Sequence, residues 1–299
     1  MLPCAKAAPP TGILFASTLC SPRAWAPVKS LCTLGFFLTL AVALIPARAA
    51  NVGAPPALTR SDWNGYPRLD FTVSGRPCLL IIPTTPAPGR PWIWRTEFFG
   101  HEPQADLALL AKGWHVAYMD AKDLYGAPKA MGWFGSFYAH LVVNYQLAKR
   151  VVLEGFSRGG LYAMNFAAAH PTRVAAIYLD APVLDIRSWP GRNRESKEWA
   201  DCLEAYGLTE VSLEKFRGNP LDRLPTIFGG AIPILAVCGD ADQTVPFAEN
   251  TAILEKRYRE LGGTIEVILK PGVDHHPHSL KDPAPIVDFL LKHAKYDKP

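Results

Sequence analysis

The sequence predicts a domain of the α/β class, in which helices cover both faces of a mostly parallel sheet. The main observation is the order of the elements: from residue 104 onward, helical and strand-like patterns alternate along the chain. Two strand-like runs precede this alternation and indicate an antiparallel hairpin at the start of the sheet. The chain has 299 residues, of which 49% are apolar, enough for one large domain or two small ones.

The hairpin is expected at 69–73 and 78–82, two apolar runs joined around Ser74-Gly75. Residues 83–101 contain many prolines and tryptophans and are expected to form a loop. Residues 183–225 are polar and lack a strand pattern. We therefore expect a lid-like insertion there, after the sixth strand of the sheet.

The other elements follow from apolar spacing and from stop signals such as Gly113 and His170-Pro171. Helices are expected at 104–112, 127–147, 158–169, 247–261 and 283–294. Strands are expected at 114–119, 150–153, 174–179, 232–238 and 264–269.

The first 49 residues have the pattern of a secretory signal. Lys29 precedes an apolar run over 34–45, and Ala47-Arg48-Ala49 then matches an A-x-A cleavage site. The alternative is a membrane anchor, but the run is shorter than the ~20 residues that span a bilayer. We therefore expect a signal peptide over 1–49, a Pro- and Asn-rich tether over 50–68 and the α/β domain over 69–299. The protein is then secreted or periplasmic, with no stable membrane insertion once the signal is removed.

The charge and the cysteine content give no indication of nucleic-acid binding or of structural zinc. The net charge of +4 comes from four basic residues in 1–49, a segment without acidic residues, and the remainder has 27 basic and 27 acidic residues. Such a neutral remainder does not indicate nucleic-acid binding. Cys78 and Cys238 lie in apolar strand-like runs, and no Cys or Cys/His spacing indicates structural zinc. We expect no metal and no organic cofactor.

The most informative motif is Gly155-Phe156-Ser157-Arg158-Gly159, a G-x-S-x-G pattern. It lies between the expected strand 150–153 and the expected helix 158–169, the strand-to-helix turn that a nucleophilic serine requires. In that turn Ser157 points out above the sheet edge. The N–H of Arg158 then lies at the start of the helix, where it can stabilise a developing oxyanion.

A serine hydroxyl needs a base, and the base needs an orienting acid. Acidic residues follow the strand 232–238, in the run 239–246, and histidines follow the strand 264–269, in the run 271–278. Both runs come directly after a strand, at the sheet edge where ligands bind in open α/β sheets. Asp180, at the end of the strand 174–179, is a competing acid.

From about Leu69 to its C-terminus, the chain resembles the α/β-hydrolase superfamily, in which the order is serine, acid, histidine. The G-x-x-D-x-x-V-P pattern of that superfamily matches 239–246 and selects Asp242 over Asp180, while Asp240 orders the turn. The P-G-x-G-H pattern matches 271–275 with Asp274 in place of glycine. It selects His275, with His276 and then His278 as alternatives.

The resemblance implies a serine hydrolase that cleaves carboxylic esters through an acyl-enzyme. The Ser-Arg-Gly pattern is similar to that of glucuronoyl esterases, where an arginine follows the serine, so Arg158 is a candidate for binding the oxyanion or a substrate carboxylate. A second oxyanion donor is expected near Trp94 or Arg95.

Tryptophans in that loop suggest an ester on a carbohydrate as the substrate, with packing against the sheet as their alternative role. A carboxylesterase of broad range that acts on small-molecule, short-chain esters fits the sequence equally well. A peptidase of the same fold and a catalytically silent binding protein remain alternative functions.

Overall fold

In the computed structural model, residues 58–294 are described. They lie in one compact unit, Gly53–Pro299. The expected signal over 1–49 lies outside the described residues. The described chain forms a nine-stranded sheet in the order β1-β2-β3-β5-β4-β6-β7-β8-β9. The strands are β1 Thr59–Trp63, β2 Tyr66–Val73, β3 Arg76–Ile81, β4 Trp92–Arg95, β5 His115–Met119, β6 Val151–Phe156, β7 Val174–Asp180, β8 Ile234–Gly239 and β9 Ile265–Lys270.

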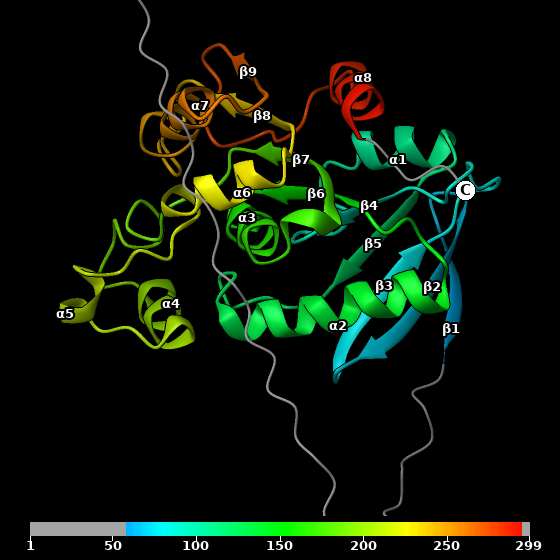
Figure 1. The fold of residues 1–299 in the computed structure, drawn as a ribbon, viewed down its shortest axis with the longest axis horizontal. Coiled ribbons are helices and arrows are strands. Elements are labelled where there is room, and N and C mark those ends of the chain that lie inside the picture. The colour runs from blue at the N-terminus through cyan, green and yellow to red at the C-terminus, as the bar shows by residue number, and fades with distance from the viewer. Residues whose placement is uncertain (1–57, 295–299) are drawn as a thin grey trace, which may run out of the picture. The chain divides into compact units, whose positions relative to one another are not determined.

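Helices cover both faces of this sheet, as the alternating pattern predicted (Figure 1). The core residues of α1 and α8 share one cluster, and those of α2, α3, α6 and α7 share the other. The helices are α1 Gln104–Ala111, α2 Pro128–Asn144, α3 Gly159–Ala169, α4 Lys197–Tyr206, α5 Glu210–Leu213, α6 Leu224–Gly229, α7 Thr251–Glu260 and α8 Ala284–His293. Short 3-10 turns are η1 Pro171–Arg173, η2 Pro220–Asp222 and η3 Phe247–Glu249.

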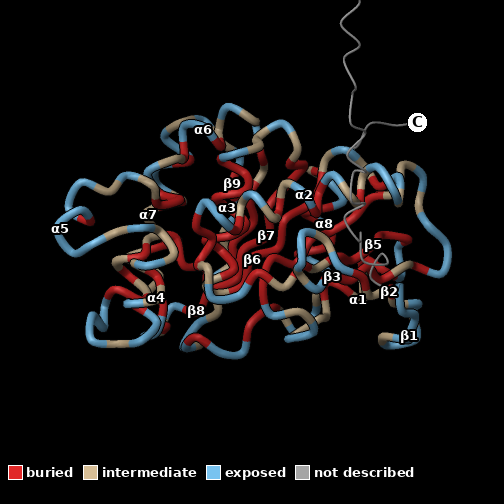
Figure 2. The backbone as a smooth tube through the Cα atoms, turned by 90° about the horizontal axis from the view of Figure 1, so that it is seen from below, coloured by how far each residue is buried: buried red, intermediate tan, exposed pale blue. Residues whose placement is uncertain are grey.

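The sheet is antiparallel at its beginning and parallel thereafter. β1, β2, β3 and β5 pair in antiparallel fashion, whereas β5, β4, β6, β7, β8 and β9 pair in parallel. The hairpin between β2 and β3 turns at Ser74 and Gly75, both with positive φ (52° and 76°), as a two-residue hairpin requires. β6, β7 and β8 are entirely buried, and Figure 2 shows them along the centre of the molecule.

Two strands were absent from the predicted elements. The predicted tether over 50–68 is wrong for residues 59–68, which form β1 and the start of β2, whereas residues 50–57 lie outside the described part. The predicted loop over 83–101 contains β4. β1 is an exposed edge strand and β4 is a fully buried strand of four residues, so neither shows the alternation that identifies a strand.

The segment 183–225 contains no strand, as expected, and it forms the helices α4 and α5, which the sequence pattern did not predict. It follows β7, the seventh strand in chain order rather than the sixth. No residue of this segment lines the pocket beside Ser157 that is described below. The segment 183–225 therefore does not contribute to the lining of this pocket, as a lid over the pocket would.

Residues 58–294 include no helix with the length and apolar character needed to cross a membrane. Cys78, Cys202 and Cys238 are buried free thiols, and burial raises the pKa of each to about 12. At neutral pH they are therefore uncharged and pack as small apolar side chains.

Candidate active site

Ser157 lies on a sharp turn between β6 and α3, as the motif predicted. Its backbone is left-handed (φ 48°), a strained conformation for a residue with a side chain. The glycines around it permit the turn: a Cβ on Gly155 would lie 2.9 Å from the carbonyl oxygen of Gly159. A Cβ on Gly160, in the first turn of α3, would lie 2.6 Å from the Cβ of Pro182. The chain can therefore make this turn only with residues that lack a side chain at these positions.

The structure brings Ser157, His275 and Asp242 together in one hydrogen-bonded chain. Nε2 of His275 is 3.0 Å from Oγ of Ser157, and Nδ1 of His275 is 2.8 Å from Oδ2 of Asp242. Because an ionised carboxylate only accepts, Nδ1 carries the proton and Nε2 is left to accept the serine hydroxyl. The three side chains come from the ends of β6, β8 and β9, on one edge of the sheet.

The carboxylate of Asp242 is fixed by its own loop. Its Oδ1 accepts the N–H groups of Thr244 (2.9 Å) and Val245 (2.8 Å), which leaves Oδ2 for the imidazole. Asp240, which was expected to order its own turn, instead accepts the N–H of Gly272 (2.7 Å) in the loop after β9. Asp274, which replaces the expected glycine, accepts the N–H groups of His275 and Gln243. These bonds lower the pKa of Asp274 and tie the acid and histidine loops together.

Asp180, the competing acid, pairs with a different histidine. Its Oδ1 is 2.9 Å from Nδ1 of His278, and its Oδ2 accepts the hydroxyl of Tyr178 and the N–H of Ser279, both at 2.8 Å. Asp180 and His278 are both buried. The loop after β9 therefore supplies the histidines of two histidine–carboxylate pairs, and the His275–Asp242 pair is the one that reaches Ser157.

The guanidinium of Arg158 is paired within the protein rather than free for a ligand. It is 3.2 Å from Oε2 of Glu97 and 3.6 Å from Asp123, and it stacks 5.3 Å from the ring centre of Phe98. Burial raises the pKa of Glu97, although Arg158 opposes this shift. The Arg158 backbone lies at the N-cap of α3, next to Ser157, where an oxyanion donor is expected.

The sequence predicted a second oxyanion donor near Trp94 or Arg95, and the structure directs the side chains of both residues into the core. Both residues lie within β4, paired with β6, and the Arg95 side chain is directed into buried ion pairs with Asp106 and Glu154. Trp94 packs against Phe134, Phe137 and Phe166 instead. The chain reaches the neighbourhood of Ser157 only after β4.

A pocket of about 470 Å³ opens beside Ser157. Besides Ser157 and His275, it is lined by Phe98, Phe99, His101, His276 and His278. Sequence reasoning missed Phe98, Phe99 and His101, which lie in the stretch expected to be a plain loop. The one feature that could have identified them is their position in the chain. They follow β4, the strand beside β6, at the sheet edge where Ser157 lies.

Comparison with known proteins identifies the family. The profile of the prolyl oligopeptidase family matches residues 137–297, more than half of the chain. The chain belongs to the prolyl oligopeptidase family. It is therefore a serine hydrolase with the α/β-hydrolase fold that the sequence predicted. The matched range includes Ser157, Asp242 and His275.

Proteins similar to this chain include an acylamino-acid-releasing enzyme, an acylaminoacyl peptidase and an S-formylglutathione hydrolase. The chain is 24% identical to the acylamino-acid-releasing enzyme of Rattus norvegicus in an alignment of 181 residues, and the match covers 56% of this chain and 22% of that protein. The structure of the Pyrococcus horikoshii acylaminoacyl peptidase matches with a TM-score of 0.58 at 15% identity, over 80% of this chain and 45% of that one. The chain thus spans less than half the length of these two relatives.

An S-formylglutathione hydrolase from Agrobacterium tumefaciens is similar over its whole length. The TM-score is 0.54 at 15% identity, and the match covers 79% of this chain and 97% of that one. At this identity the likeness concerns the fold alone. The described part of this family member therefore shares its fold with nearly the whole of that hydrolase and with less than half of the acylaminoacyl peptidase.

Proposed function

We propose that the protein hydrolyses carboxylic esters through an acyl-enzyme formed on Ser157. The observation that supports this is the hydrogen-bonded chain from Ser157 through His275 to Asp242. In this reaction Nε2 of His275 takes the Ser157 proton as Oγ attacks the ester carbonyl. Asp242 stabilises the resulting imidazolium, and His275 returns the proton to the leaving alkoxide. Water then attacks the acyl-enzyme, with His275 as base again.

The oxyanion of the tetrahedral intermediate needs two donors. We assign the first to the backbone N–H of Arg158, next to Ser157 at the start of α3. We assign the second to the backbone N–H of Phe98, which lines the pocket and turns the loop after β4 with a left-handed backbone (φ 53°). The Arg158 side chain, held by Glu97, then supports the loop that carries Phe98.

The pocket has room for a small-molecule ester. About 470 Å³ lies in the lower half of the range of about 300–1,000 Å³ for small-molecule sites, and Phe98 and Phe99 supply apolar surface. Trp92 and Trp94, which suggested stacking on sugars, are fully buried beneath the sheet surface and do not line this pocket. Short-chain esters are therefore the proposed substrates, and carbohydrate esters stay an untested prediction.

A peptidase is the second candidate, because the family and two of the relatives above are peptidases. The same serine and histidine can cleave an amide if the leaving amine is protonated by His275. Activated esters such as p-nitrophenyl acetate are cleaved by serine esterases and serine peptidases alike, so turnover of an amide, acetyl-alanine p-nitroanilide, separates the two candidates. We expect no measurable turnover of the anilide; its turnover by the unmodified protein, lost in Ser157→Ala, would favour the peptidase.

The variant that tests the proposed nucleophile is Ser157→Ala, which removes the attacking Oγ and keeps the turn. We expect it to lose nearly all hydrolysis of p-nitrophenyl acetate, with an unchanged circular dichroism spectrum. Turnover at the rate of the unmodified protein would refute the assignment of Ser157.

Export is a separate proposal, based on the sequence of 1–49 alone. We propose cleavage after Ala49. The N-terminal sequence of the native protein should begin at Ala50, and a native chain that begins well upstream would contradict cleavage.

A further inference from the structure

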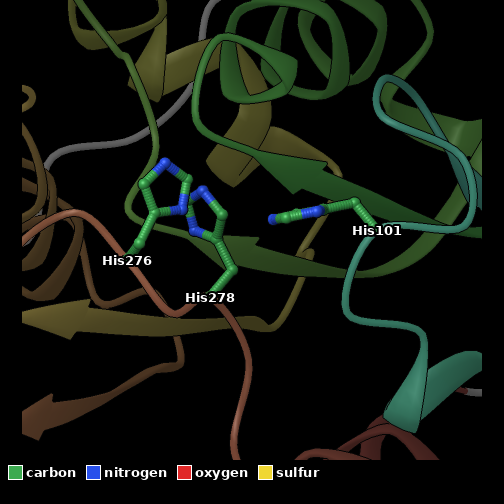
Figure 3. Close-up of side chains that lie close together, drawn as sticks. All are labelled: His101, His276 and His278. Atoms are coloured by element: carbon green, nitrogen blue, oxygen red, sulfur yellow. The ribbon is translucent and has the colours of Figure 1, made fainter.

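We propose that His101, His276 and His278 form a binding site for a divalent transition-metal ion, with zinc as the best match. One ring nitrogen of each residue lies within 4.8 Å of the others. Figure 3 shows His276 and His278 side by side on the loop after β9, with the ring of His101 reaching toward them from the loop after β4. The three rings are nearly perpendicular to one another, with interplanar angles of 79° to 85°.

His278 already has the bond that metal-binding histidines characteristically make. Its Nδ1 faces the Asp180 carboxylate at 2.9 Å, and that carboxylate is held in turn by Tyr178 and Ser279. A carboxylate at one ring nitrogen fixes the tautomer, so that the other nitrogen presents a lone pair. The ester hydrolysis proposed above does not use this buried His278–Asp180 pair, and metal binding gives it a role.

The other two ligands are anchored at the backbone and free to adjust at the ring. The carbonyl oxygen of His101 accepts a hydrogen bond from Nη1 of the buried Arg95 at 2.7 Å. Lys270 donates to the carbonyl oxygens of Pro277 and Ser279, which fixes the loop that carries His276 and His278. The side chains of His101 and His276 are exposed.

The geometry requires only a small closure. Zn²⁺ binds imidazole nitrogen at about 2.0–2.1 Å, which places tetrahedral ligands roughly 3.3 Å apart. The present spacing of up to 4.8 Å closes by rotation of the two exposed rings. Three neutral imidazoles suit Zn²⁺, Co²⁺, Ni²⁺ and Cu²⁺ rather than Mg²⁺ or Ca²⁺, which prefer oxygen ligands. Three protein ligands leave a fourth position open for water or a ligand.

This site is distinct from the proposed catalytic chain, although both line the same pocket. His275 is engaged on both ring nitrogens, by Asp242 and Ser157, so it is not among the proposed ligands. Metal binding should therefore survive Ser157→Ala and His275→Ala. The two proposals can fail separately, because binding is measured without substrate.

The test is titration of the purified, untagged full chain with ZnCl₂ by calorimetry, after chelator treatment. We expect one Zn²⁺ per chain, with at least tenfold weaker binding for His101→Ala and for His276→Ala. His140→Gln, a histidine of α2 that does not line the pocket, is the matched control and should bind like the unmodified protein. With Co²⁺ in place of zinc, the visible absorption bands of four-coordinate cobalt should appear and should be lost in His101→Ala.

Three results would overturn the site. The first is failure to saturate at millimolar zinc. The second is binding by His101→Ala and His276→Ala that equals that of the unmodified protein. The third is a loss in His275→Ala as large as that in His276→Ala, which would place the ion on the proposed catalytic histidine instead.

Discussion

Asp180 and Asp242 are two buried carboxylates, and each is hydrogen-bonded to a histidine of the loop after β9. They differ in whether that histidine lies within hydrogen-bond distance of Ser157. Asp242 orients His275, which reaches Oγ of Ser157 at 3.0 Å. Asp180 orients His278, for which the structure shows no hydrogen bond to Ser157. The sequence pattern selected Asp242 and His275, and the structure places both in one chain with Ser157.

The two acids should therefore respond differently to amide substitution. Asp242→Asn should lower kcat for p-nitrophenyl acetate on the order of 10³–10⁴-fold, because an amide no longer enforces the tautomer that leaves Nε2 unprotonated. Asp180→Asn should lower kcat less than tenfold. Steady-state kinetics on both folded variants checks this, and an equal loss in the two would contradict the assignment of the acid.

His115, the first residue of β5, predicts a pH dependence of stability. It is buried, and burial lowers its pKa to about 4, below the unfolded value of about 6.5. Between these two values only the unfolded chain binds the proton, so stability is present above pH 6.5 and is lost as the pH falls toward 4. Such a shift corresponds to about 3 kcal/mol.

Urea unfolding at several pH values between 4 and 7 measures this loss. His115→Gln, which has no titrating ring, should show a smaller fall in unfolding free energy over that range than the unmodified protein. Parallel curves for the two proteins would show that His115 does not titrate as its burial implies.

At the scale of elements, the turn from β6 into α3 depends on close approach between backbones. Gly160 faces Pro182 and Val183, and a Cβ there would lie 2.9 Å from the carbonyl oxygen of Val183. By contrast, a Cβ on Gly132, inside α2, would meet nothing within 4 Å. Close packing therefore requires a glycine at Gly160, whereas a side chain would meet no neighbouring atom at Gly132.

Alanine at these two positions should shift stability in opposite directions. Gly160→Ala should lower the unfolding free energy by about 1–3 kcal/mol, the usual cost of overpacking. Gly132→Ala should raise it by about 0.5–1 kcal/mol, because alanine restricts the unfolded chain and favours the helix. Urea unfolding of both variants measures the difference, and a stabilised Gly160→Ala would contradict the close packing described.

Most elements could be predicted because their buried faces leave a pattern in the sequence. The strands β5 to β9 and the helices α1 to α3 were found within a few residues. β1 was missed because it is exposed at the sheet edge, and β4 because four fully buried residues show no alternation. His101 could not be predicted as part of the site, because only the fold brings the loop after β4 to the loop after β9.

At the scale of the whole molecule, Arg95 links the sheet to the helix layer and to the site loop. Its guanidinium is 2.8 Å from Asp106 of α1 and 2.9 Å from Glu154 of β6, and it also donates to the carbonyl oxygens of Phe98 and His101. Burial raises the pKa of Glu154 well above its ordinary value, although Arg95 opposes this shift. The loop that lines the pocket is therefore anchored to the core.

Removal of this cation should leave buried carboxyl groups without a partner. Arg95→Met should lower the unfolding free energy by about 3–5 kcal/mol. Arg259→Met, which removes a surface pair with Glu255, is the matched control and should have little effect. Thermal or urea unfolding compares the two, and equal small effects would show that the Arg95 cluster does not hold the fold together.

A fluorophosphonate probe, which reacts with an activated serine, tests whether Ser157 is a nucleophile that His275 activates. Intact-mass analysis should show one adduct per chain, and peptide mapping should place it on Ser157. Labelling should be absent in Ser157→Ala and much slower in His275→Ala. A chain that is not labelled would be a catalytically silent fold, and an adduct that persists in Ser157→Ala would place the reactive group elsewhere; either result would contradict a nucleophilic Ser157.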